Sequence, residues 1–438
     1  MADGRAALPC ALPGSPLAKE ASGLDMCVHC GFCLQACPTY LALEGENDSP
    51  RGRLVLMRGL LDGELSPTDP AVLTHLDRCL GCVGCESACP SGVPYGRLLE
   101  ATRATLAAHR PIPRVARAVL GVFRSPLLLR VAFALSRVLR WSQLHHLVRH
   151  LPPRQSFPFA MLASTRPTLP KVSYLPDVPP PGAPRVALLQ GCVMEGLYAP
   201  TNRATERVLQ MNGYAMVPAP GQACCGALHA HAGDAATARA LAKCNIAAFE
   251  QSGAEYVVVN ASGCGATMKE YGHLLGDDPA WRHRAAAVGQ RVRDVSELLA
   301  ARGPRVGGAL PCSVTYDAPC HLQHAQRVVS PPLAVLAAIP GLRVTTLTDS
   351  DLCCGSAGIY NLVEPETSER VLANKLDHLQ HTGADWVVTG NPGCLMQIGA
   401  GLIQRRSHMR GVHLVDLLDA SYAEDRKRQR GEPSAHEH

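Results

Sequence analysis

The chain has 438 residues, a hydrophobic content of 47% and a mean hydropathy of +0.02. A chain of this length typically folds into about three domains and is too long for a single small domain. The formal net charge of +5 comes from one segment, because residues 101–176 hold twelve Lys and Arg and no Asp or Glu. The remainder has 30 basic against 37 acidic residues, so the surface as a whole is not basic.

The nineteen cysteines are the second compositional feature. Most of them cluster at spacings typical of metal ligands, which favours a reducing compartment over a disulfide scaffold. Residues 1–22 lack the basic and long apolar regions of a signal peptide. No window of about 18 apolar residues is free of charge, so we predict no transmembrane helix. We therefore expect a cytoplasmic protein.

Two cysteine runs near the N-terminus share the pattern C-x2-C-x2-C-x3-C-P. The first run contains Cys27, Cys30, Cys33 and Cys37, and the second contains Cys79, Cys82, Cys85 and Cys89. This spacing is typical of [4Fe–4S] clusters, and in two-cluster ferredoxins the fourth cysteine of each run ligates the other cluster. We therefore predict one cluster on Cys27, Cys30, Cys33 and Cys89, and another on Cys79, Cys82, Cys85 and Cys37.

Structural zinc is the main alternative for these eight cysteines, since four thiolates also suit Zn2+. Zinc sites usually consist of two short C-x2-4-C pairs with a longer spacer, so the repeated run favours iron–sulfur. Between the runs, residues 51–61 and 70–77 have helical periodicity. We expect residues 1–100 to form a mainly helical two-cluster domain.

A basic connector is predicted over residues 101–184. Residues 114–124 and 127–141 read as basic amphipathic helices, with arginines at spacings that suggest one face. This face could be solvated, or it could dock on an anionic membrane or an acidic partner. Nucleic acid is disfavoured, because lysine is almost absent here and no binding motif accompanies the arginines. Prolines at 152–153 and 179–181 then indicate loops.

The remaining chain contains an internal repeat. In each copy a short apolar strand leads to a cysteine, a Cys-Cys-Gly follows a helix and a strand, and a fourth cysteine follows another helix and strand. The three cysteine stations recur at offsets of 128, 129 and 130 residues, which indicates a duplicated module. The expected strands lie at 185–192, 214–217 and 256–260, then at 314–320, 342–347 and 386–389. The expected helices lie at 200–211, 234–251 and 365–382.

Alternating strands and helices predict parallel α/β sheets, in which the carboxyl ends of the strands form a binding crevice. Each cysteine station follows a strand, so we expect four sulfurs to meet in each module. The first set is Cys192, Cys224, Cys225 and Cys264, and the second is Cys320, Cys353, Cys354 and Cys394. Additional iron–sulfur binding is the favoured interpretation, with zinc or metal-free redox thiols as alternatives. Three cysteines outside the pattern, Cys10, Cys244 and Cys312, are read as ordinary thiols, with Cys244 buried on its helix.

The predicted fold is therefore a multidomain α+β chain. A helical two-cluster [4Fe–4S] domain (1–100) is followed by the basic helical connector (101–184). Two α/β cysteine-rich modules (185–305 and 306–425) come next, and then a disordered tail (426–438).

Several segments together carry a family resemblance. They are Cys27-Val-His-Cys-Gly-Phe-Cys33, Pro50-Arg-Gly-Arg53, Ala261-Ser-Gly-Cys-Gly265, Leu322-Gln-His-Ala-Gln326 and Leu352-Cys-Cys-Gly-Ser-Ala-Gly358. The repeat resembles the cysteine-rich (CCG) domain of heterodisulfide reductase-type proteins. Combined with the two-cluster domain, it resembles the iron–sulfur subunits of glycolate oxidase (glycolate dehydrogenase) over nearly the whole chain.

The resemblance implies an electron-transfer subunit in a complex that oxidises glycolate to glyoxylate. Flavin-bearing partner subunits would take the hydride, and this chain would pass electrons toward a membrane quinone or another acceptor. No G-x-G-x-x-G follows a strand, so no flavin or nicotinamide site and no catalytic residue is predicted here. Alternative functions are a subunit of a D-lactate or glycerol-3-phosphate dehydrogenase complex, a heterodisulfide reductase-like thiol–disulfide enzyme, or a zinc scaffold.

The repeat departs from the broader cysteine-rich domain at one position. That domain often ends in C-x-x-C, which supplies five thiolates for a non-cubane cluster. Here Ala261 and Asn391 stand where the first of these two cysteines would be, so each module has four cysteines. A conventional cube and an empty site therefore both stay open.

Overall fold

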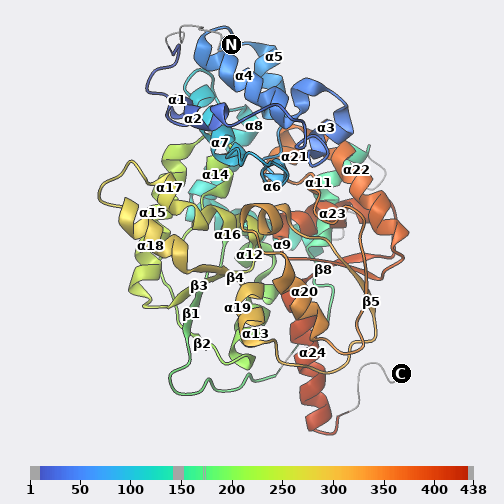
Figure 1. Cartoon of the computed structure of the whole chain (residues 1–438). Helices are drawn as coiled ribbons and strands as arrows, with labels where there is room; N and C mark the ends of the chain where they lie inside the picture. The colour runs from blue at the N-terminus through green and yellow to red at the C-terminus, as the bar shows by residue number, and fades with distance from the viewer. Residues whose placement is uncertain (1–9, 142–151, 171, 173, 433–438) are drawn as a thin grey trace. The chain divides into compact units, whose positions relative to one another are not determined.

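The structure is a computed structural model that describes residues 10–141, 152–170, 172 and 174–432 (Figure 1). The chain divides into two compact units. Unit 1 combines Met1–Leu120 with two short segments from the repeat, Leu228–Ala238 and Gly355–Val371. Unit 2 contains the rest of the chain. The domain boundaries predicted from the sequence are not tested by this division, which follows spatial contacts.

Unit 1 is helical in its described part. Its elements are α1 (Pro16–Lys19), α2 (Ala21–Asp25), α3 (Pro38–Leu43), the 3-10 helix η1 (Glu46–Asp48), α4 (Pro50–Asp62), α5 (Pro70–Asp77), α6 (Gly84–Ser87) and α7 (Tyr95–Ala107), with α14 (Ala227–His231) and α21 (Tyr360–Val363) at the repeat segments. The predicted helices at 51–61 and 70–77 are confirmed as α4 and α5. Both begin with proline at their first position, where the missing N–H costs nothing, after caps by the Ser49 and Asp69 side chains.

Unit 2 holds two four-stranded parallel sheets with the orders β2-β1-β3-β4 and β6-β5-β7-β8. The first sheet has β1 (Arg185–Leu188), β2 (Ala215–Met216), β3 (Tyr256–Val259) and β4 (Val292–Asp294); the second has β5 (Ser313–Tyr316), β6 (Arg343–Thr345), β7 (Trp386–Thr389) and β8 (Arg410–His413). The matching orders confirm the α/β duplication. The central pairs also share a register, with Val186 opposite Tyr256 and Val314 opposite Trp386.

Helices surround these sheets. They are α9 (Pro126–Trp141), α11 (Pro153–Ser164), α12 (Cys192–Leu197), α13 (Ala199–Met211), α16 (Ser262–Lys269), α17 (Tyr271–Leu274), α18 (Arg282–Arg291), α19 (Val295–Arg302), the π-helical turn η2 (His321–Ala325), α20 (Ser330–Ala337), α23 (Pro392–Gln404) and α24 (Leu414–Gln429). Three further helices, α8 (Arg114–Arg124), α15 (Ala235–Gln251) and α22 (Pro365–His381), begin in unit 1 and end in unit 2. Val258 of the first sheet and Val388 of the second belong to one hydrophobic cluster, so the two modules share a core.

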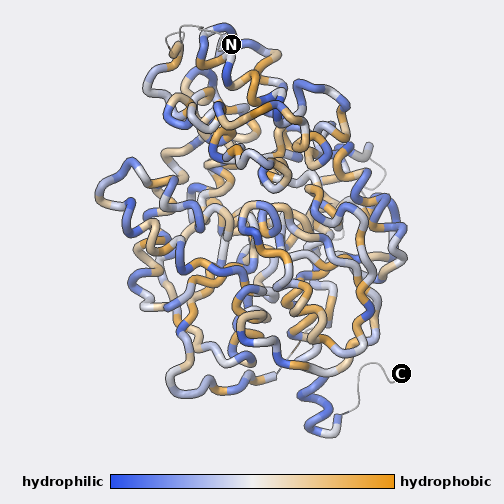
Figure 2. Tube along the Cα trace, viewed as in Figure 1, coloured by the Kyte–Doolittle hydropathy of each residue, from blue (hydrophilic) through white to orange (hydrophobic). Residues whose placement is uncertain are grey.

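Four sequence expectations differ from the structure. The outer strands β4 and β8 are additional, and they are short and carry charged or glycine residues that weaken a strand pattern. Cys244 is exposed on α15, contrary to the expectation from the sequence that it is buried on its helix. Helix α24 continues to Gln429, so residues 426–429 are helical and not part of a disordered tail; its C-terminal half is hydrophilic in Figure 2. Residues 433–438 and 142–151 lie outside the described residues.

The fourth difference concerns the basic connector. Arg130 and Arg137 are exposed on α9, but Arg140 is buried and donates to the carbonyl oxygens of Thr165 and Leu197 at 3.0 and 3.2 Å. The arginines of this helix therefore do not share one face. Among the described helices none can span a membrane alone by length and composition, and α8 and α9 meet that test only as a pair bent by 104°.

Candidate metal centres

The first cysteine run forms a tight loop ahead of α3. His29 and Gly31 both have left-handed backbone conformations, with φ of 53° and 84°, which bend the chain sharply between the cysteines. A cavity of about 30 Å3 opens beside this loop, and its cysteine lining is Cys27, Cys30, Cys33, Cys85 and Cys89. The four cysteines predicted for one cluster therefore lie around a common space, and Cys85 borders it as well.

The other four predicted ligands gather more deeply. Cys37, Cys79 and Cys85 are buried, and Cys82 is half-buried. Burial raises the pKa of Cys85, and the charges of Cys82, Cys79 and Cys37 raise it further. Cys37 is thus a charge neighbour of Cys85 in the second run, as crossed ligation requires, and also of Cys33 in its own run. Eight thiols in two sets of four suit two [4Fe–4S] cubes, although ligation by these residues stays a prediction.

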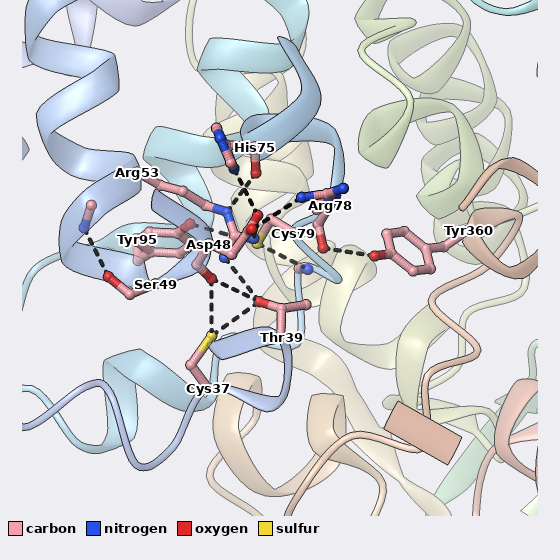
Figure 3. Close-up of polar contacts among 12 residues, drawn as sticks. Cys37, Thr39, Asp48, Ser49, Arg53, His75, Arg78, Cys79, Tyr95 and Tyr360 are labelled. Carbon is pink, nitrogen blue, oxygen red and sulfur yellow. Dashed lines mark hydrogen bonds and ion pairs between the residues drawn. The ribbon is translucent and has the colours of Figure 1, made fainter. Parts of the chain in front are cut away.

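A buried ionic network adjoins this second set (Figure 3). Arg53 is fully buried. Its Nε donates to the carbonyl oxygen of His75 at 2.7 Å and one terminal nitrogen donates to Thr39 Oγ1 at 3.0 Å, while the other lies 3.4 Å from Asp48 Oδ1. Asp48 also pairs with His75 Nδ1 at 3.1 Å and with Arg78 at 3.2 Å. One carboxylate therefore faces two guanidinium groups.

Hydrogen bonds connect this region to two cysteine sulfurs. Thr39 Oγ1 lies 3.2 Å from Cys37 Sγ, and the Tyr95 hydroxyl donates to Cys79 Sγ at 3.5 Å. Burial by itself would raise the pKa of Cys79, but Arg53, Arg103 and the Tyr95 hydroxyl lower it overall. The surroundings of Cys79 thus favour the thiolate, which is the form that binds metal.

Local sequence explains how Arg53 reaches this position. Gly52 packs against η1, and a Cβ there would lie 2.1 Å from the carbonyl oxygen of Glu46. Glycine at 52 lets α4 start directly after η1, which brings Arg53 and Asp48 together. Arg51 points elsewhere, since it donates to Glu46 at 2.6 Å and to the carbonyl of His29 at 3.4 Å.

The two repeat segments of unit 1 pack beside Cys79. Arg103 donates to the carbonyl oxygens of Cys79 at 2.6 Å and His231 at 3.0 Å. The Tyr360 hydroxyl donates to the carbonyl of Arg78 at 2.7 Å. Residues 228–238 and 355–371 follow the two Cys-Cys pairs in sequence, so both pairs continue directly into the helical unit. Sequence reasoning missed Asp48, Tyr95, Arg103 and Tyr360; Pro50-Arg-Gly-Arg53 was the only local signal.

The first repeat brings its four cysteines together. Cys192 Sγ lies 3.5 Å from Cys224 Sγ, and Cys225 Sγ lies 3.1 Å from Cys264 Sγ. The pKa of Cys192 is raised by its hydrogen bond with Cys224, by burial and by the charges of Cys224 and Cys264. Asn245 on α15 supports the loop, since its side chain accepts from Ala223 N at 2.8 Å and donates to the Cys224 carbonyl at 3.0 Å.

The second repeat has the same thiol arrangement but different support. A hydrogen bond with Cys353 raises the pKa of Cys320, and Cys354 hydrogen-bonds with both Cys353 and Cys394. Asn391, at the position of the absent fifth thiolate, donates to Cys394 Sγ at 3.5 Å. From α22, Lys375 donates to the carbonyl oxygens of Asp349 at 2.6 Å and Ser350 at 3.3 Å, shortly before the Cys-Cys pair. Within the described residues, no group of three or more His, Cys, Asp or Glu side chains is arranged to hold a metal ion.

Comparisons with known proteins agree with this architecture. A family profile described as a 4Fe-4S dicluster domain matches residues 23–93, and one described as a cysteine-rich domain matches twice, at 186–269 and 314–399. The "Probable glycolate oxidase iron-sulfur subunit" of Bacillus subtilis is 41% identical over 90% of this chain and 92% of its own length. The "Glycolate oxidase iron-sulfur subunit" of Escherichia coli is 36% identical over 85% and 88%. "Lactate utilization protein A" of Exiguobacterium sp. is 29% identical over 54% and 97%.

Proposed function

Because this chain belongs to the family of glycolate oxidase iron–sulfur subunits, we propose that it carries electrons within a complex that oxidises glycolate to glyoxylate. Flavin-bearing partner subunits take the hydride, since iron–sulfur clusters move one electron at a time. The observation that supports the proposal is the closeness of the two cysteine runs in unit 1: Cys27, Cys30, Cys33, Cys85 and Cys89 line one cavity, and Cys37, Cys79 and Cys82 are charge neighbours of Cys85.

Reduction by substrate tests this division of labour. The purified complex should show the EPR signals of reduced clusters after anaerobic addition of glycolate, whereas the isolated chain should need dithionite. Reduction by D-lactate or glycerol 3-phosphate and not by glycolate would overturn the proposed substrate. Lactate is the specific competitor, because a protein named lactate utilization protein A is 29% identical over 54% of this chain.

We further propose two [4Fe–4S] clusters in unit 1, with additional iron–sulfur binding by the thiols of the repeats. Iron and acid-labile sulfide analysis of anaerobically purified protein distinguishes the cases. About eight irons correspond to the first two clusters alone, and a larger number requires the repeats. Zinc without iron or sulfide would overturn the electron-transfer role. Heterodisulfide reduction by the isolated chain would favour a thiol–disulfide enzyme.

For the electron acceptor we propose a quinone, reached by a cytoplasmic protein that docks peripherally on the inner membrane surface. The exposed face of α9 supports this, because its large apolar side chains are about half exposed or more: Leu127, Leu128, Val131, Leu135, Val138 and Trp141. Arg130 and Arg137 flank this apolar stripe, and residues 101–176 contain no acidic residue. An apolar stripe with a basic border suits an anionic lipid surface.

Co-sedimentation with vesicles containing anionic lipid tests this docking. Leu135→Glu with Val138→Glu should abolish binding, and Arg130→Gln with Arg137→Gln should weaken it at low salt. Arg140 is left intact because it is buried. Val306→Glu is the matched control, since Val306 is also a strongly exposed apolar side chain of unit 2. Equal binding by all variants would contradict the docking, and binding to a flavoprotein partner lost in the same variants would assign the face to that partner.

A further inference from the structure

We propose that the buried charges of Arg53 and Asp48 set the reduction potential of the cluster held by Cys37 and the second cysteine run, with Arg53 raising the potential and Asp48 lowering it. The inference rests on the proposed presence of that cluster. It goes further, because it assigns a redox role to two side chains that are not ligands.

The charge balance of the network is the first step. Arg53 has no exposed surface, and the Asp48 side chain is only 4% exposed. Burial by itself would lower the pKa of Arg53, but the charges around it, that of Asp48 among them, raise it overall, so the guanidinium stays charged. Because Arg53 and Arg78 share the single carboxylate of Asp48, a positive charge remains in excess.

The second step is the closeness of this charge to the sulfurs. Arg53 donates to Thr39 Oγ1 at 3.0 Å, and the same oxygen lies 3.2 Å from Cys37 Sγ. Only one hydroxyl therefore separates the guanidinium from this sulfur (Figure 3).

The physical consequence follows from the charge of the cluster. A cube bound by four thiolates is anionic, and reduction adds another negative charge, so burial disfavours the reduced form. A buried cation nearby favours the reduced form, and because the cation is buried, salt and water screen it weakly. Arg53 thus offsets the cost of placing this cluster inside the protein.

Among the residues that the structure describes, no buried cation equivalent to Arg53 adjoins the first run. Arg51 is the charged residue beside that loop, but its side chain is 31% exposed and it pairs with Glu46 in a one-to-one ion pair. Such a pair adds little net charge, and solvent screens it. The two clusters therefore experience unequal fields although their ligand patterns are the same.

EPR-monitored redox titration of the full-length protein tests this assignment, with iron content measured in parallel. Arg53→Gln should shift the equilibrium of the second-run cluster against the reduced form by on the order of tenfold, equal to about 59 mV for one electron. Asp48→Asn should shift it in the opposite direction. Arg53→Lys keeps the charge and should restore most of the potential. Arg58→Gln is the control, because Arg58 lies on the same helix and pairs with the exposed Asp25.

A purely structural role for these residues predicts a different result. Loosening of the site would move the potential in the same direction in Arg53→Gln and Asp48→Asn, and that outcome, or unchanged potentials with both clusters present, would overturn the assignment. If the Arg53→Gln variant loses its cluster, the assignment is decided by Asp48→Asn alone, in which the reduction potential should rise. Absence of the second cluster from the wild-type protein would instead refute the proposed function.

Discussion

Lys375 Nζ lies 3.0 Å from Asp317 Oδ1, and both side chains are only 2% exposed. Lys375 also donates to the carbonyl oxygen of Asp349 at 2.6 Å, shortly before the second Cys-Cys pair. Burial would lower the pKa of Lys375, but the charge of Asp317 raises it, so the ammonium stays charged. The ion pair thus fixes the long helix α22 to the strand end and to the thiol-bearing loop.

Removing one partner of this pair should be costly. Lys375→Met leaves Asp317 buried and uncompensated, so the free energy of unfolding should fall by about 3–5 kcal/mol. The double variant with Asp317→Leu should recover much of this loss, because no buried charge is left. Urea denaturation followed by circular dichroism measures both. Lys243→Met is the control, since Lys243 makes a partly exposed pair with Asp278 worth at most about 1 kcal/mol.

In the first module, Asn245→Ala should lower the free energy of unfolding by about 2 kcal/mol, because buried polar groups of the Cys-Cys loop lose their partners. The side chain of Asn245 bonds Ala223 N and the Cys224 carbonyl, and it also donates to the Tyr271 hydroxyl at 3.1 Å. Cys244→Ser, on the neighbouring and exposed residue, should stay within about 0.5 kcal/mol of wild type. Equal losses in the two variants would show that Asn245 does not support the loop.

Cys37→Ser tests the crossed ligation. Because crossed ligation assigns Cys37, a charge neighbour of Cys85, to the second-run cluster, its loss should disturb the EPR signal of that cluster and spare the first. Cys89→Ser should have the reverse effect, since Cys89 borders the first-run cavity. A Cys37 variant in which only the first-run cluster changes would mean that each run closes on its own cube.

The pH dependence of stability should change in Asp416→Asn. Burial raises the pKa of Asp416 to about 7, against a lowering by the hydroxyl of Thr201, which donates at 2.9 Å. The folded chain therefore holds this proton more tightly than the unfolded chain, whose aspartates titrate near about 3.9. Between these values the Asp416 contribution to the free energy of unfolding falls as pH rises, and above about pH 7 it is constant.

Thermal unfolding of both proteins at pH 5.5, 6.5, 7.5 and 8.5 measures this effect. The stability of Asp416→Asn relative to wild type should rise with pH by up to about 1.4 kcal/mol per unit and level off above pH 7. His413, whose pKa burial lowers to about 4, gives the opposite slope, but it is present in both proteins and cancels in the difference. A difference that is flat from pH 5.5 to 7.5 would contradict the burial of an ionisable Asp416.

The sequence predicted the features that follow from its patterns. Short windows of residues show the apolar strands, such as Tyr256–Val259, and the helices that start with proline. Comparison of the two halves of the repeat shows its nearly constant period. Arg53 shows the limit of this approach, because a periodicity argument treats an arginine on an amphipathic helix as solvated. Its burial depends on Asp48 and on the close approach at Gly52, which are properties of packing. Arg140 and Cys244 were misplaced for the same reason, since composition alone does not orient a helix.

The discontinuous make-up of unit 1 has a consequence for biosynthesis. A domain formed by an uninterrupted N-terminal segment can finish folding while the ribosome still translates the rest of the message. Here the contacts of the first 120 residues are complete only when residue 371 has been made, 251 codons later. The hydrophobic core around the cysteine runs involves residues up to Leu106 only, so it can form early, whereas the contacts made by residues 228–238 and 355–371 must wait. Final closure of this unit is then a late event in the life of a newly made chain.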